Sequence, residues 1–163
     1  MKAHKNIVWF TGTGYPGPIV PYEPKLKDFL DNGGQLFMSG FDILDQAAGT
    51  TAFVHDYLHV TWDGSETQND KATVNVTAVG GTIMDGLGSV ALVHSVLGGA
   101  TFEDRITPNG TSVGIFTDDS AAFDGLSFSG TYKVVFLAFP FEEYGAASNQ
   151  NALVGRVKTF FGP

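Results

Sequence analysis

The chain has 163 residues, 43% of them hydrophobic and 13% aromatic, which is enough to build the core of one folded domain and argues against a disordered protein. Its net charge of −8 excludes the basic surface that nucleic acids and anionic membranes attract, so we expect neither as a partner. The absence of cysteine excludes disulfides, thiolate nucleophiles and cysteine-bound metals.

The first predicted element is a buried strand over residues 7–11, a short apolar run that ends in a turn rich in glycine and proline. The run is too short for a signal-peptide core or a membrane span, so we expect no signal peptide here and no membrane insertion. Residues 21–31 predict a helix, which the pair Gly33-Gly34 ends. The apolar run 35–38 then predicts a second strand, parallel to the first.

In the rest of the chain, the predicted secondary structure changes from helix to antiparallel strands and then to a final strand and helix. A helix is predicted over residues 47–58, and residues 60–130 show β-propensity with frequent turn residues, which predicts an antiparallel elaboration. Residues 133–139 return to a continuous apolar strand, and residues 149–161 carry the periodicity of a final helix. We therefore expect a single domain over residues 1–163, of the α/β class, with three layers and a mainly parallel, flavodoxin-like sheet flanked by helices.

Two ends of the chain support a family resemblance. The segments NIVWFTG, LDNGGQLFMSGFDI and VVFLAFPFEEY resemble degenerate class I glutamine amidotransferase-like domains, of the kind carried by large secreted bacterial proteins that often contain subtilisin-like peptidases. The resemblance implies a flavodoxin-like core that lacks the family's first strand and helix. It also implies a site at the turn after the strand that ends in Ser39.

The departures from that family bear on its chemistry. An active member carries a cysteine near Ser39, and this chain has none. The histidine of the family's late turn falls on Phe139, Pro140 is kept, and the acid shifts to Glu142. Phenylalanine cannot accept a proton from a nucleophile, so amidotransferase chemistry is not expected.

An enzymatic alternative remains open at this edge of the sheet. Ser39 paired with a histidine such as His55, or Glu142 paired with Asp42, would make a small hydrolase. The bulky Phe37 and Phe41 on either side of Ser39 do not fit the nucleophile elbow of serine hydrolases. The competing interpretation is that Ser39 and Asp42 satisfy the backbone of the turn.

Non-catalytic binding is the third alternative. The candidate ligand-binding residues are Asp42, Tyr15 and Tyr144, which would suit weak binding of a cation or a glycan. His55 and His59 are four residues apart, but the sequence supplies no recognisable third ligand, so we expect no metal site and no cofactor.

The function favoured by the sequence is a non-catalytic accessory or interaction domain of an exported bacterial protein. Its expected location is extracellular or at the cell surface. Its expected partners are neighbouring domains of a parent protein or another extracellular protein.

Overall fold

A computed structural model describes residues 4–12, 14, 19–45, 48–64, 74–93 and 102–163. Its centre is a seven-stranded sheet in the order β1-β2-β9-β8-β7-β4-β5, beside a two-stranded sheet of β3 and β6. The strands are β1 (Asn6–Gly12), β2 (Gln35–Gly40), β3 (Val60–Thr61), β4 (Asn75–Ala78), β5 (Ser89–Ala91), β6 (Thr107–Pro108), β7 (Val113–Thr117), β8 (Phe123–Ser129) and β9 (Lys133–Leu137). The helices are α1 (Glu23–Asp31), α2 (Ala52–Asp56) and α3 (Ala147–Phe161), and three short 3-10 turns are η1 (Val20–Tyr22), η2 (Ala48–Thr50) and η3 (Phe141–Glu143).

The parallel part of the sheet comprises β1, β2 and β9. β1 and β9 both pair with β2 in parallel, with Ile7 opposite Leu36 and Leu36 opposite Val134. The predicted strand, helix and strand over residues 7–38 are therefore confirmed. Gly34 allows α1 to lie against β2, because a Cβ atom at this position would be 2.4 Å from the Phe29 ring.

The antiparallel part begins where β9 pairs with β8. From there β8 pairs with β7, β7 with β4 and β4 with β5, all antiparallel. Only two of the six pairings in the seven-stranded sheet are parallel. The antiparallel region predicted from residues 60–130 is thus the larger part of the sheet and continues it directly.

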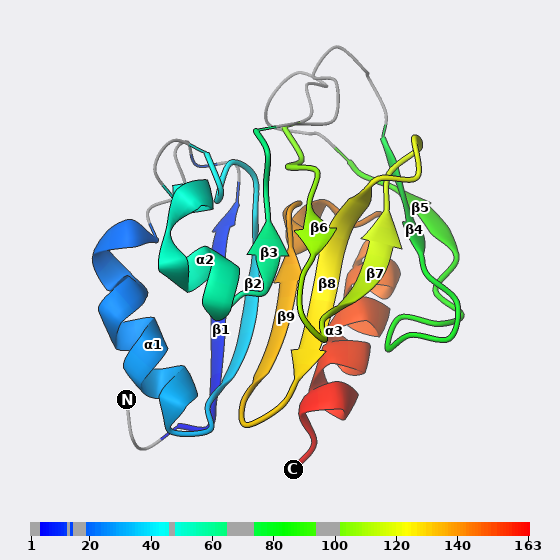
Figure 1. Cartoon of the computed structure of the whole chain (residues 1–163). Helices are drawn as coiled ribbons and strands as arrows, with labels where there is room; N and C mark the ends of the chain where they lie inside the picture. Colours follow the sequence, from blue (N-terminus) through cyan, green and yellow to red (C-terminus); the bar gives the residue numbers. More distant parts are fainter. Residues whose placement is uncertain (1–3, 13, 15–18, 46–47, 65–73, 94–101) are drawn as a thin grey trace.

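The two faces of the sheet are covered differently (Figure 1). On one face, α1, α2 and β3 enclose a core to which the sheet contributes Leu36, Met38 and Phe136. On the other face, α3 packs alone over Phe37, Val135 and other residues that alternate with the first set. The figure shows α3 running behind the sheet, away from β1.

The expected fold class is wrong. The structure has a mixed, curled sheet with three α-helices in the described residues, and it is not a mainly parallel, three-layer flavodoxin-like fold. The expectation extended the parallel pattern of the two chain ends to the whole sheet. The middle of the chain instead returns through short antiparallel connections, which need no crossover helix.

Two predicted helices have different bounds in the structure. The helix expected over residues 47–58 is divided into η2 and the five-residue α2, whose first turn is capped by the Thr51 hydroxyl accepting from the Val54 N–H at 3.3 Å. The final helix starts earlier than expected, at Ala147, where the Asn149 side chain accepts from the Ala146 N–H at 3.1 Å. Residues 83–86, inside the predicted β region of residues 60–130, form turns.

Candidate functional site

Ser39 lies at the end of β2 and is completely buried. Its hydroxyl donates a hydrogen bond to the Phe139 carbonyl and accepts one from the Phe141 N–H, each at 2.8 Å. These bonds join β2 to the turn that follows β9. Because the hydroxyl proton and an oxygen lone pair are already used by the main chain, Ser39 has the geometry of a structural residue and not that of a nucleophile.

Neither His55 nor Glu142 forms a hydrogen bond with the Ser39 hydroxyl. His55 is exposed on α2, where its Nδ1 is 2.7 Å from Asp56 Oδ1. Glu142 is exposed in η3, and its Oε1 lies 2.9 Å from the position of a Cβ atom built on Gly12, at the end of β1. Within the described part of the chain, no histidine contacts Ser39.

The candidate ligand-binding residues do not form a surface platform. Tyr144 is fully buried against Phe116 and Phe139, and this burial raises the pKa of its phenol to about 12. Asp42 is also buried and has a positive φ of 51° in the turn after β2. Tyr15 lies outside the described residues.

A different set of acids gathers at the carboxyl edge of the parallel strands. We call Glu103, Asp104, Asp118 and Asp124 the buried acidic cluster, because each is less than 5% exposed. Asp104 Oδ2 accepts from the Leu44 N–H at 3.2 Å, in the turn after β2. The Asp124 carbonyl accepts from the Ala138 N–H at 2.8 Å, just beyond β9. This edge of the sheet is where open α/β folds place their ligands.

One arginine partly balances the buried acidic cluster. Arg105 Nε donates to Asp118 Oδ2 at 2.9 Å, and Asp118 Oδ1 accepts from the Ser120 and Ala122 N–H groups. Asp124 differs from Asp118, since neither of its carboxyl oxygens has a hydrogen-bond partner among the described residues. Burial, followed by the charges of Asp118 and Glu103, raises the pKa of Asp124 well above its ordinary value. The neutral form of Asp124 is therefore favoured in the folded protein.

The cluster does not have the geometry of a metal centre. In the part of the chain that the structure describes, no group of three or more histidine, cysteine or acidic side chains is placed to hold a metal ion. Burial raises the pKa of Asp124, and the charges of the other three acids of the cluster act on it in the same direction. His55 and His59 also fail to share a helix face, because α2 ends at Asp56 and His59 has a positive φ of 59°.

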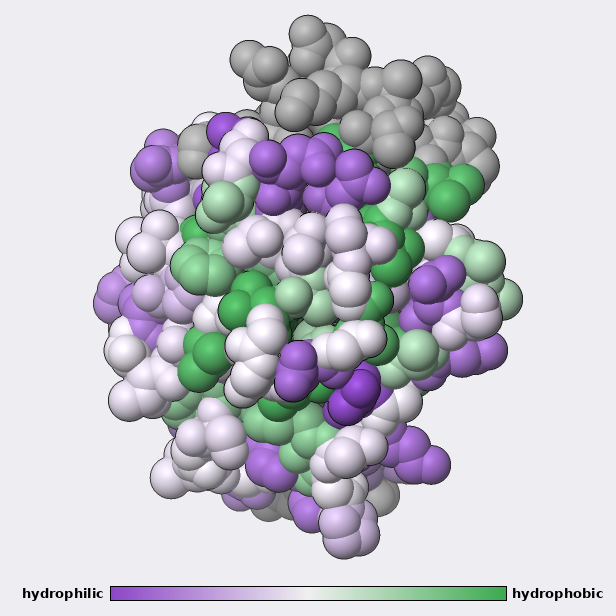
Figure 2. All heavy atoms as spheres, turned by 90° about the vertical axis from the view of Figure 1, so that its right-hand side faces the viewer, coloured by the Kyte–Doolittle hydropathy of each residue, from purple (hydrophilic) through white to green (hydrophobic). Residues whose placement is uncertain are grey.

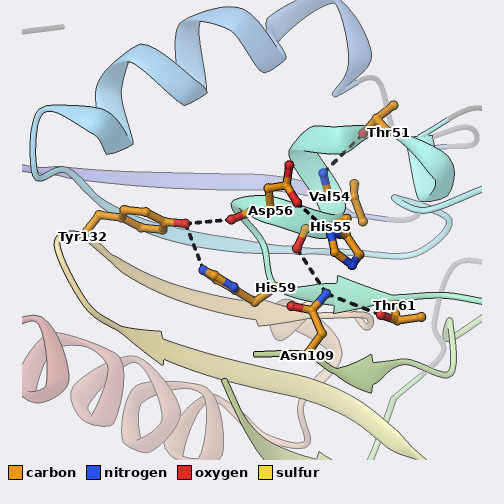
Figure 3. A network of polar contacts seen from close by, with 8 residues as sticks. All are labelled: Thr51, Val54, His55, Asp56, His59, Thr61, Asn109 and Tyr132. Carbon is orange, nitrogen blue, oxygen red and sulfur yellow. Dashed lines mark hydrogen bonds and ion pairs between the residues drawn. The ribbon is translucent and has the colours of Figure 1, made fainter. Parts of the chain in front are cut away.

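A second polar network joins α2 to the β8–β9 hairpin (Figure 3). His59 Nε2 lies 2.9 Å from the Tyr132 hydroxyl, which donates to the Asp56 carbonyl at 3.1 Å. Because the single hydroxyl proton goes to Asp56, His59 Nε2 is the donor of the bond to Tyr132. Nearby, Asn109 Nδ2 donates to the His55 carbonyl at 3.1 Å. Burial lowers the pKa of His59, so its neutral form is favoured in this network.

Comparison with known proteins identifies similar folds without a function. The chain is similar to the cytoplasmic protein STM3548 of Salmonella typhimurium, with a TM-score of 0.65 and 11% identity over 95% of this chain and 71% of that one. It is also similar to the cytoplasmic protein STM1381 of Salmonella typhimurium LT2, with a TM-score of 0.64 and 12% identity over 91% of this chain and 66% of that one. No family model and no curated protein matches the sequence. At these identities the similarity shows the fold alone.

The comparisons correct one expectation. Both similar structures are described as cytoplasmic proteins, which contradicts the extracellular or cell-surface location expected from the sequence, and the secreted, peptidase-associated setting has no support. No helix in the described ranges is both long and apolar enough to cross a membrane.

Sequence reasoning missed the buried acidic cluster. The sequence predicts an antiparallel elaboration for residues 60–130, and its pattern does not identify any of these four acids as buried. Each of these acids has an apolar neighbour one or two positions away, such as Phe102, Ile106 or Phe116. Those neighbours were the available signal that the acids enter the core.

Proposed function

We propose that this protein is a non-catalytic interaction domain. The observation that carries the proposal is the state of Ser39, whose buried hydroxyl donates to the Phe139 carbonyl and accepts from the Phe141 N–H. A catalytic serine needs a free hydroxyl and a base within hydrogen-bond reach, and Ser39 contacts main-chain groups in both directions. The residue at the expected base position, Phe139, is itself buried in the core.

The interaction part of the proposal is supported by the surface. Val8 and Phe10, both on β1, are the two most exposed large hydrophobic side chains of the described residues, at 57% and 60%. Exposed apolar side chains that gather on one element are typical of protein–protein contact sites. The carboxylate-based hydrolase alternative has weaker support, because Glu142 lies beside β1 and Asp42 is buried in the turn after β2.

The proposal is tested with a fluorophosphonate probe, which labels activated serines covalently. We expect the wild-type protein to remain unlabelled, like its Ser39→Ala variant, while a known serine esterase in the same assay is labelled. Nitrophenyl esters and glycosides, assayed with the wild type and with Glu142→Gln, should show no turnover above buffer. Labelling that is lost in Ser39→Ala, or turnover that is lost in Glu142→Gln, would establish an enzyme and overturn the proposal.

A further inference from the structure

The outer edge of β1 carries the most exposed apolar surface of the described residues. Val8 and Phe10 project from the same face of this strand, the face that α3 leaves uncovered. Phe10 contacts Phe141 of η3 edge-on, with ring centroids 5.8 Å apart. On the opposite face, Trp9 packs against Tyr22, which is itself 44% exposed.

Main-chain groups on the outer side of β1 have no hydrogen-bond partner among the described residues. β1 pairs only with β2 among the described strands, and the Gln35 N–H donates to the Lys5 carbonyl at 2.9 Å. In a parallel pair, alternate residues bond to the neighbouring strand, so the backbone groups of Asn6, Val8 and Phe10 point away from β2. The strand sequence NIVWFTG contains no charge and no proline, the usual devices that protect an edge from pairing.

The opposite edge of the sheet is different. It ends in β5, a strand of three residues, and short edge strands discourage pairing. Figure 2 views the molecule from that side and shows hydrophobic residues interspersed with hydrophilic ones. The two edges therefore differ both in length and in their apolar side chains.

The charges at the two ends of β1 indicate which strand fits this edge. His4 and Lys5 precede the strand, and the Glu142 carboxylate lies beside Gly12 at its end. In an antiparallel pair centred on Val8, the first residues of one β1 lie opposite the last residues of the other. Lys5 Nζ donates to the Pro163 carbonyl of its own chain at 2.8 Å and has two further N–H donors, so that in this pair the positive charge of Lys5 lies toward Glu142 of the second copy. A parallel pair would bring like ends together.

We propose that two copies of this chain pair through β1, antiparallel about a two-fold axis at Val8, so that their sheets become continuous. Val8 meets Val8 of the second copy at the axis, and Phe10 lies opposite Asn6. The outward backbone groups of both strands become paired, and Val8 and Phe10 of each copy gain cross-strand neighbours on the same face. The inference rests on the proposed function, because it names the surface and the partner of the interaction.

The first test is sedimentation equilibrium of the wild type, Val8→Lys and Val93→Lys over a wide concentration range. We expect the wild type to approach the mass of two chains, and Val8→Lys to remain a single chain because it places two lysines together at the axis. Val93→Lys is the matched control, since Val93 is also exposed, at 52%, but lies beyond β5. A monomeric wild type, or a Val8→Lys variant that dimerises as well as the wild type, would overturn the inference.

A second test uses a neutral substitution at Val8 in place of a lysine. The chain has no native cysteine, so Val8→Cys introduces a single thiol at the proposed axis. Residues directly opposite in an antiparallel pair have Cα atoms about 5.5 Å apart, within the range of a disulfide. We expect Val8→Cys to form a covalent dimer on mild oxidation and Val93→Cys to stay reduced; equal crosslinking would contradict the geometry. Either result leaves the fluorophosphonate assay of Ser39 unaffected, so failure of the dimer and failure of the proposed function are distinguishable.

Discussion

At the scale of single residues, Asp124 is unusual because acidic side chains are seldom fully buried. Its carboxyl group is fully buried, has no hydrogen bond from the described residues, and lies within the influence of three other acids and one arginine. A charged carboxylate in such a place costs far more than a neutral carboxylic acid. Folding therefore favours the protonated form of Asp124, which makes the stability of the fold depend on pH.

This arrangement predicts how Asp124→Asn responds to pH. The folded pKa of Asp124 is raised, so its stabilising effect is present below the unfolded pKa and is lost as the pH rises toward the folded pKa. Asparagine stays neutral, so we expect the free energy of unfolding of the variant to match the wild type near pH 4 and to exceed it increasingly toward pH 8. Urea unfolding followed by circular dichroism measures this difference.

The matched control for Asp124→Asn is Asp85→Asn. Asp85 is exposed in the turn between β4 and β5, so the substitution makes the same Asp-to-Asn change outside the buried acidic cluster. Its stability difference from the wild type should not change with pH in the same direction or by the same amount. A stability difference for Asp124→Asn that is independent of pH would show that Asp124 is not held neutral.

At the scale of elements, the Tyr132 hydroxyl connects the β8–β9 hairpin to the end of α2. Replacing it in Tyr132→Phe removes both the acceptor of the His59 Nε2–H and the donor to the Asp56 carbonyl. We expect a loss of about 0.5–1.5 kcal/mol in the free energy of unfolding, because the ring stacking with Tyr57 and Phe128 is retained. Thermal and urea unfolding measure the loss.

Tyr22→Phe is the control for Tyr132→Phe, because Tyr22 is partly exposed and also packs against an aromatic ring. Its stability should stay within about 0.5 kcal/mol of the wild type. If Tyr132→Phe also stays within that range, the hydroxyl does not hold the hairpin to α2.

The elements that were predicted correctly are the ones with an uninterrupted pattern. β1, β2 and β9 are continuous apolar runs, and α1 and α3 show helical periodicity with buried residues such as Leu26 and Leu153. β8 was not singled out, because Asp124, Gly125 and Ser127 interrupt its apolar residues. All three are buried, and Gly125 faces Leu137 so closely that a Cβ atom would lie 2.9 Å from Cδ2. A strand that packs this closely needs a small residue such as glycine, so its sequence lacks the apolar run by which strands are predicted.

The candidate site was also only partly predictable from local patterns. The turn after β2 was located correctly from the Gly33-Gly34 pair and the apolar run that follows it. A role of Ser39 in satisfying backbone groups was one of the interpretations, but its two partners could not be identified from the sequence, because they belong to residues 139 and 141, about one hundred positions away. The buried acids near this turn come from β8 and from the segment before β6. These segments are not adjacent in the sequence, so no short sequence motif could predict that the acids meet.

At the scale of the whole molecule, two buried acids with raised pKa values both make the fold less stable as the pH rises. Asp124 lies at the carboxyl edge of the sheet, and Glu143, in η3, has its pKa raised to about 7 by burial and by the charge of Glu142. Both groups bind protons more tightly in the folded state than in the unfolded state. The molecule also carries a net charge of −8 at pH 7, so each further ionisation adds to its self-repulsion.

The wild-type protein should therefore be more stable at pH 5 than at pH 8. For Glu143 the loss falls between its ordinary pKa of 4.5 and about 7, and Asp124 adds a loss that begins above its ordinary value of 3.8. The urea midpoint, measured at several pH values, should fall across this range in the wild type. In the double variant Asp124→Asn/Glu143→Gln it should be nearly constant. A wild-type midpoint that rises with pH would mean that paired acids such as Asp118, bound to Arg105, control the pH dependence instead.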